Sequence, residues 1–171
     1  MRFERVEYES FSKDMRKWLP VMKDARDSYL AKILNMVTMP RRETKGSAGY
    51  DFRLPIPVTI PSGGKVVVPS GIRAVFREDE METWHLQVYV RSSTGIRKET
   101  DIPNGTGIID ADYYLSENGG DILLALKNNS DHTVMFGQGE RVCQGIFMIH
   151  GLTEDDDANG YRTGGVGSTG R

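Results

Sequence analysis

The chain has 171 residues, a single cysteine, and 22 lysines and arginines against 24 aspartates and glutamates, which gives a formal net charge of -2. This length predicts one domain, and the balanced charge argues against binding to nucleic acid or to an acidic membrane surface through bulk electrostatics. Cys143 has no partner for an internal disulfide, and no segment approaches the roughly 20 apolar residues of a membrane span. We therefore expect a soluble protein of the reducing cytoplasm, or of the host cytoplasm if the gene is viral.

The N-terminal part carries the one convincing helical pattern. Residues 2–8 alternate loosely, which predicts a first strand. In residues 12–37, apolar side chains recur at three- and four-residue steps, the spacing of one helix face. Pro20 lacks an amide proton, so it should divide this segment and lie near the start of the longer second piece. Four large side chains of this face are Met15, Trp18, Met22 and Tyr29. We interpret the face as packing against the rest of the domain; a partner-binding surface is the alternative.

The sequence after Thr38 predicts an all-β domain. Prolines and glycines interrupt it every few residues around short β-branched runs, as in a sandwich or barrel. The clearest strand is 84–90, where apolar and polar residues alternate, so that one face should be buried. Further strands are predicted at 121–126, 133–136 and 141–149. In all we expect about nine to eleven strands.

The C-terminal end has a different composition. An acidic linker precedes a glycine-rich end, so we divide the chain into a β domain, residues 1–153, and a mobile arm, residues 154–171. Glycines let backbone amides approach an anion closely, and Arg162, Ser168 and Thr169 add a charged donor and two hydroxyl donors. The arm is therefore suited to wrapping a phosphate. A flexible end without any role is the alternative.

Four further segments place polar groups where they could do chemistry. Residues 91–95 put an arginine and two serines at a strand end, where several donors can meet one phosphate group. Residues 104–113 suggest a tight hairpin that holds a carboxylate near a cavity, able to orient or deprotonate water. Gln144 and Asp51 each interrupt an apolar strand, and a buried polar group needs partners. Taken singly, an ordinary serine-rich turn and a hairpin with solvated aspartates remain open.

The order of these segments is more specific than any one of them. Along the chain they read Ala-Gly-Tyr-Asp-Phe, Arg-Ser-Ser, Asn-x-x-Gly-x-Ile-Asp-x-x-Tyr, Gly-x-Arg-x-x-Gln and Arg-x-Gly-Gly-x-Gly-Ser-Thr-Gly. This order resembles the five motifs of the homotrimeric dUTPase family, from about residue 40 to 171. The resemblance implies a jelly-roll-like β-barrel that forms a homotrimer, active sites assembled from more than one subunit, and an arm that closes as a lid. It also implies hydrolysis of dUTP to dUMP and pyrophosphate with Mg²⁺.

The resemblance assigns roles on the nucleoside side. Asp110 matches the general base that activates the water attacking the α-phosphorus. Tyr113 matches the tyrosine that packs on the deoxyribose and excludes a 2′-hydroxyl. The uracil reader corresponds to Asn104 with the backbone of Gly107, Ile108 and Ile109.

On the phosphate side, the resemblance assigns contacts to two parts of the chain. Arg91 and Gln144 act in catalysis and bind phosphate, together with Ser92 and Ser93. The arm residues that match substrate contacts are Arg162, Val166, Gly167, Ser168 and Thr169. Magnesium would be ligated by substrate and water, with Asp51 as an outer-shell partner and no direct protein ligand.

Three departures from the family pattern stand out. The link 114–119 is longer than usual, and Asp121 follows it where the family usually has glutamate. Val166 replaces the usual arm phenylalanine that lies over the uracil, which removes roughly 0.5–1.5 kcal/mol of stacking. The helical segment 12–37 occupies a place where many family members have only a short loop. No role for it follows from the resemblance.

Two other functions on the same fold stay open. The first is a non-catalytic dUTP-binding sensor or regulatory protein, with the helical segment as its partner surface. The second, less favoured, is a dCTP deaminase, which would need a carboxylate suited to attack at the cytosine ring. Pyrophosphate release from dUTP, binding without turnover, and ammonia release from dCTP separate the three.

Overall fold

The computed structural model describes residues 1–160, 162 and 164. Its eleven strands are β1 (Arg2–Arg5), β2 (Tyr50–Arg53), β3 (Val58–Ile60), β4 (Lys65–Pro69), β5 (Ile72–Val75), β6 (Trp84–Val90), β7 (Thr100–Asp101), β8 (Gly107–Ile109), β9 (Leu123–Asn128), β10 (Val134–Phe136) and β11 (Arg141–Ile149). The helices are α1 (Tyr8–Trp18) and α2 (Asp27–Met36), with 3₁₀ turns η1 (Pro20–Met22), η2 (Glu78–Glu80) and η4 (Tyr113–Leu115) and a short π-helix, η3 (Ser93–Arg97). The chain is all-β with few helices, as predicted. Of the predicted site residues, Val166, Gly167, Ser168 and Thr169 lie outside this description.

The strands form four antiparallel sheets. The largest has the order β2-β11-β6-β8, beside a three-stranded sheet β4-β9-β7 and the pairs β1-β5 and β10-β3. Strands β6 and β11 are the long spine of the molecule, and both occupy the predicted ranges. Leu86 and Val88 of β6 are buried, as their alternation with polar residues requires. In the register of this sheet Gln144 lies opposite both Tyr89 and Asp51, so these polar side chains share one face.

The helical segment differs from its prediction in three respects. It begins at Tyr8 rather than at residue 12, and Pro20 starts only a 3₁₀ turn, so that α2, with 10 residues, is shorter than α1, with 11. The expected longer second piece is therefore wrong. Tyr29 was expected on the packing face but is 49% exposed, because the buried stripe of α2 consists of Leu30, Ile33 and Leu34. A proline at the first helical position tolerates a short turn without forcing a long helix.

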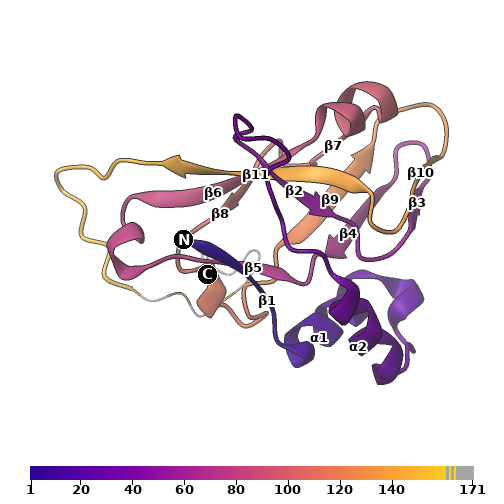
Figure 1. The fold of residues 1–171 in the computed structure, drawn as a ribbon, viewed down its shortest axis with the longest axis horizontal. Helices are drawn as coiled ribbons and strands as arrows, with labels where there is room; N and C mark the ends of the chain where they lie inside the picture. Colours follow the sequence, from indigo (N-terminus) through magenta and orange to yellow (C-terminus); the bar gives the residue numbers. More distant parts are fainter. Residues whose placement is uncertain (161, 163, 165–171) are drawn as a thin grey trace.

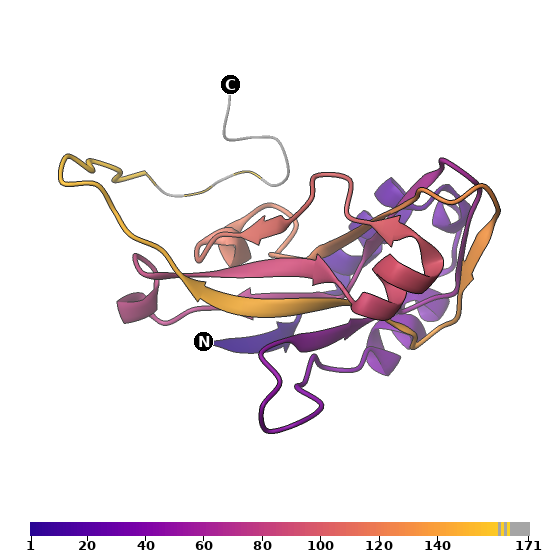
Figure 2. The same cartoon turned by 90° about the horizontal axis from the view of Figure 1, so that it is seen from above.

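Helices α1 and α2 share one core with the strands. Phe11 and Met15 of α1 are fully buried within the cluster that also holds Ile72 and Leu124 of the sheets. Helix α1 packs against β4 and against α2, and both helices lie together at one end of the molecule (Figure 1). Beyond Ile149 the chain leaves the spine at the opposite end (Figure 2). The segment is thus an integral part of the barrel's packing.

The tight hairpin predicted for residues 104–113 is wrong. The turn itself is present, since Gly105 donates its amide to the carbonyl of Ile102 at 2.8 Å. The strands on either side of it pair elsewhere, however: β7 pairs with β9, and β8 adds to the edge of the spine by pairing with β6. The segment is therefore a loop between two sheets, and Asp110 follows directly where β8 ends.

Two observations complete the fold. Within the described residues, no helix combines the length and the apolar character needed to span a membrane. The free thiol of Cys143 is fully buried on β11, and burial raises its pKa to about 12. Such a thiol stays protonated and behaves as a small apolar side chain, as the sequence predicts.

Candidate active site

The predicted site residues gather around two separate pockets. One, of about 720 Å³, is lined by Asp51, Arg91, Ser92, Ser93 and Gln144 together with Glu43, Ser47, Gly49, Ile96, Arg97 and Arg141. We call it the arginine pocket. The other, of about 880 Å³, contains Asn104, Gly107, Ile108, Ile109, Asp110, Tyr113 and Arg162 on walls of aliphatic side chains. We call it the apolar pocket. The two share no lining residue, so this chain alone does not bring the two groups together.

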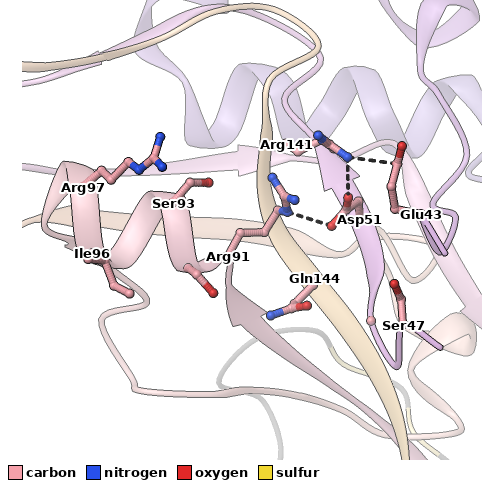
Figure 3. Close-up of a pocket in the computed structure, with 11 residues that line it drawn as sticks. Glu43, Ser47, Asp51, Arg91, Ser93, Ile96, Arg97, Arg141 and Gln144 are labelled. Carbon is pink, nitrogen blue, oxygen red and sulfur yellow. Dashed lines mark hydrogen bonds and ion pairs between the residues drawn. The ribbon is translucent and has the colours of Figure 1, made fainter.

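The arginine pocket is organised around one carboxylate. Asp51, only 8% exposed, accepts from Nε of Arg91 at 2.8 Å and from a terminal nitrogen of Arg141 at 3.2 Å (Figure 3). Glu43 takes a second contact from Arg141 at 2.9 Å. These pairs fix the guanidinium planes in space while other N–H donors of both arginines remain available. A pre-oriented pair of guanidiniums is a ready receptor for a phosphate group.

Local backbone geometry places the rest of this pocket. The chain turns sharply after β6, because the amides of Thr94 and Gly95 both bond to the carbonyl of Arg91 at 2.9 Å. This turn leaves Ser92 and Ser93 exposed at the pocket rim. On the opposite wall, a Cβ at Gly49 would lie 2.4 Å from Oε1 of Gln144. Only glycine at position 49 therefore lets the Gln144 amide occupy its place.

The apolar pocket joins three parts of the fold. The loop after β7 and strand β8 form one wall, and β4 and β9 form another. The third wall is Trp18, Leu19 and Pro20 from the end of α1, which sequence reasoning did not place at any site. Asn104 is exposed on the loop, where its amide donates to the carbonyl of Thr106 at 3.3 Å. The pocket thus offers backbone polar groups on an otherwise apolar lining, which suits a flat heterocycle.

Asp110 lies at the mouth of the apolar pocket and is paired with the arm. Its carboxylate accepts from Arg162, whose Nε also donates to Asp112 at 3.0 Å. The guanidinium of Arg162 lies 5.5 Å from the centre of the Tyr113 ring. The Asp110 side chain is still 51% exposed, and it also borders a third pocket beside His85 and His150. It is the carboxylate best placed to meet both ligand and water.

Hydrogen bonds to its hydroxyl anchor Tyr113. The residue is 7% exposed, and its hydroxyl donates to the carbonyl of Asp121 at 3.3 Å while Asn118 approaches it at 3.1 Å. Burial raises the pKa of the Tyr113 phenol, so it stays a neutral hydrogen-bond donor. The ring is therefore held at one place on the pocket floor.

Comparison with known proteins decides the family. A family model described as dUTPase matches residues 35–170 of this chain. The chain belongs to the dUTPase family. The match begins at residue 35, so that β1, α1, η1 and nearly all of α2 precede it. The predicted membership is confirmed, and the helical segment lies outside the family pattern.

Several relatives carry the same description. A deoxyuridine 5′-triphosphate nucleotidohydrolase of Lactococcus lactis is 38% identical over 138 residues, covering 78% of this chain and 89% of the relative. One from Anaeromyxobacter is 34% identical over 139 residues, covering 78% and 88%. The crystal structure of dUTPase from Streptococcus mutans aligns with a TM-score of 0.61 at 38% identity, over 68% of this chain and 88% of that one. The jelly-roll-like fold is that of the family.

The next question is whether the described residues could hold a metal ion. A dUTPase of a Staphylococcus aureus phage, 19% identical with a TM-score of 0.59, is described as coordinating a structural Mg(II) ion, and that likeness extends to the fold alone. In residues 1–160 with 162 and 164, no three His, Cys, Asp or Glu side chains form a metal cage. Asp51 is engaged by two arginines.

Several residues that line the pockets or support them were not predicted as site residues, among them Arg141, Trp18 and Asn118. Arg141 belongs to the Gly-x-Arg-x-x-Gln motif, and its place three residues before Gln144 on β11 was the available signal. Trp18 and Asn118 had no signal, because both come from segments that depart from the family pattern.

Proposed function

We propose that this chain hydrolyses dUTP to dUMP and pyrophosphate. The observation that carries the proposal is the position of Asp110, an accessible carboxylate at the mouth of a pocket that is floored by Tyr113 and lined by the backbone of β8. Membership of the dUTPase family supports the same reaction. The carboxylate acts as general base on the attacking water.

The apolar pocket would take the nucleoside. Uracil would contact Asn104 and the backbone of Gly107, Ile108 and Ile109, where a cytosine amino group meets the wrong hydrogen-bonding pattern and a thymine methyl lacks space. Tyr113 would pack on the deoxyribose. Because the ring is buried and bonded through its hydroxyl, it cannot retreat to admit a 2′-hydroxyl.

The arginine pocket would take the phosphates. Arg91, Ser92, Ser93 and Gln144 would bind them, with Arg162, Val166, Gly167, Ser168 and Thr169 of the arm closing over the substrate. The triphosphate carries more negative charge than a single carboxylate, so it competes for the guanidinium of Arg162. Binding of substrate would then release Asp110 from its ion pair with Arg162 and free it to take a proton.

The chemical step is a single displacement. The water oxygen forms a bond to the α-phosphorus, the bond from that phosphorus to the bridging oxygen breaks, and pyrophosphate leaves with the electron pair. Asp110 accepts the water proton. A magnesium ion carried on the phosphates, with Asp51 at its outer sphere, would supply charge neutralisation of the leaving pyrophosphate.

The separation of the pockets supports assembly of the site between subunits. We propose a homotrimer in which the apolar pocket of one subunit faces the arginine pocket of another, with residues 1–153 as the catalytic domain and 154–171 as the arm. A head-to-tail interface brings different patches of neighbouring subunits together, and three subunits can close such an interface into a ring. A cytoplasmic location suits both the substrate and the free thiol of Cys143.

A substrate panel tests the proposal. Purified chain with Mg²⁺ should release pyrophosphate from dUTP and much less from UTP, dCTP and dTTP. Ammonia release from dCTP would instead identify a deaminase, and tight dUTP binding without turnover a sensor. Absence of all three activities would contradict the proposed use of both pockets.

A further inference from the structure

The hydroxyl of Tyr113 is bonded on two sides. It donates to the carbonyl oxygen of Asp121 at 3.3 Å, and the Nδ2 amide of Asn118 lies 3.1 Å away, where it can donate to the phenolic oxygen. One group uses the hydroxyl as a donor and the other uses it as an acceptor. Both roles of the phenol are therefore filled, which fixes the direction of the ring.

The amide of Asn118 is itself held in one orientation. Its Oδ1 accepts from the hydroxyl of Ser116 at 2.7 Å and from the amide of Gly120 at 3.1 Å. With the oxygen occupied in this way, the Nδ2 end must face the other direction, toward Tyr113. Asn118 thus couples the position of the Tyr113 ring to the conformation of the 114–119 link.

The same amide nitrogen also reaches the carbonyl oxygen of Asp121, at 3.1 Å, and the helical segment. Asn118 Nδ2 donates to Oδ2 of Asp14 at 3.0 Å, across 104 positions of sequence. Asp14 lies on α1, next to the fully buried Met15, and is only 3% exposed. Burial raises the pKa of the Asp14 carboxyl, and a buried carboxyl without a donor would be costly, so the contact with Asn118 holds both groups together.

We propose that Asn118 and Asp14 are positioning residues that set the discrimination between deoxyribose and ribose by fixing Tyr113. The proposal rests on the function given above for Tyr113. Both residues belong to segments in which this chain departs from the family pattern, the 114–119 link and the segment that precedes the family match at residue 35. These two segments contact each other through the hydrogen bond between Asn118 and Asp14. Helix α1 also supplies Trp18 to the wall of the same pocket.

Small displacements of the Tyr113 ring decide how much space a 2′-hydroxyl would find. A ring that is held by two hydrogen bonds excludes a 2′-hydroxyl by contact, whereas a ring free to tilt yields space to it. Loss of one net hydrogen bond changes an equilibrium by about three- to tenfold. The effect should therefore appear as improved use of UTP relative to dUTP, and the chemical step on dUTP should change little.

The experiment compares kcat/KM for dUTP and UTP across matched variants. Asn118→Leu removes the amide at nearly constant volume, and Asp14→Leu removes the acceptor; each should lower the dUTP/UTP ratio about three- to tenfold. Asp14→Asn keeps an oxygen that can accept from Asn118, so it should restore the ratio. Glu117→Gln in the same link and Glu9→Leu on the exposed side of α1 are the controls and should leave it unchanged.

The possible results distinguish failure of this inference from failure of the proposed function. Unchanged ratios in Asn118→Leu and Asp14→Leu, in a protein that hydrolyses dUTP, would overturn the inference alone. If the unaltered chain binds dUTP without turnover, the same ratio measured as dissociation constants decides the inference. If it neither binds nor hydrolyses dUTP, both are wrong. Thermal unfolding confirms that the variants fold, and Asn118→Ala replaces Asn118→Leu if the latter does not.

Discussion

The two pockets are built by different physical means. In the arginine pocket, a carboxylate between two guanidiniums fixes the direction of positive charge, and ion pairs at 2.8 and 3.2 Å define the geometry. In the apolar pocket, backbone groups and packed rings define the geometry, and its charged groups lie at the rim. Charge suits the triphosphate, whose recognition needs strength, whereas a shaped apolar wall suits the nucleoside, whose recognition needs discrimination.

The pockets also differ in how they depend on the rest of the chain. The arginine pocket is built from segments that lie entirely within the family match. The apolar pocket draws one wall from the end of α1 and anchors its tyrosine through Asn118 and Asp14. We infer that this chain keeps phosphate recognition in common with its family and adds its own support to the nucleoside side.

Asp110→Asn tests the apolar pocket and should have the largest effect. The amide cannot take the water proton, so kcat should fall by about 10²–10⁴-fold while binding of a non-hydrolysable dUTP analogue persists. Asp112→Asn is the matched control, because it also loses a contact with Arg162. Equal losses in steady-state kinetics for both variants would contradict a special role for Asp110.

Gly49→Ala should impair the arginine pocket alone. The new Cβ would lie 2.4 Å from Oε1 of Gln144 and displace that amide from the phosphates. A hydrogen bond to a charged group contributes about 1.5–3 kcal/mol, so kcat/KM for dUTP should fall about ten- to a hundredfold. Inhibition by deoxyuridine, which occupies only the apolar pocket, should stay the same.

Gly46→Ala is the control for that variant, since nothing lies within 4 Å of its added Cβ. A weakened deoxyuridine inhibition in Gly49→Ala would show that the two pockets are not independent.

Asp121→Asn contrasts a buried carboxyl held by the backbone amide of Gly71 with the arginine-paired Asp51, and it should have the smallest effect on activity. Asp121 is fully buried, its Oδ2 has no partner within the described residues, and burial raises its pKa well above the ordinary value. The folded state therefore binds this proton more tightly than the unfolded state. Above the unfolded pKa of about 4, stability is lost as pH rises, at up to about 1.4 kcal/mol per pH unit.

The variant has no proton to lose, so it should gain stability relative to the unaltered chain from pH 4 to pH 8, as measured by urea unfolding. The matched variant Asp51→Asn loses two ion pairs and should show no such gain. A stability difference for Asp121→Asn that is constant over this range would contradict the assignment.

Sequence patterns predicted the fold where local and tertiary preferences agree. The alternation in 84–90 and the apolar run in 141–149 predicted β6 and β11 at their observed bounds, because β6 buries alternate residues and β11 is paired on both sides within the sheet. The helical segment and its interruption at Pro20 were predicted, but the 3₁₀ turn and the shorter second helix after that proline were not. The loop at 104–106 looked like a hairpin because turn chemistry does not reveal which sheet each flanking strand will join.

The sequence predicted many of the residues that form the site, but only part of how they are arranged in space. Motif order identified the residues that line the two pockets, including Arg91, Asp110 and Tyr113. It implied active sites assembled from more than one subunit, but it did not reveal which residues share a pocket within one chain, nor that Asn118 and Asp14 meet behind Tyr113. Contacts across 104 positions arise from tertiary packing and leave no local pattern.

Mixed oligomers test most directly whether the two pockets complete each other across subunits. Asp110→Asn disables the apolar pocket and Arg91→Ala the arginine pocket, and each variant alone should have little activity. When the two are coexpressed in equal amounts, about a quarter of the head-to-tail sites should combine two intact pockets, so activity should return to about that fraction. Mixed oligomers that stay as inactive as either variant alone would contradict a site shared between chains.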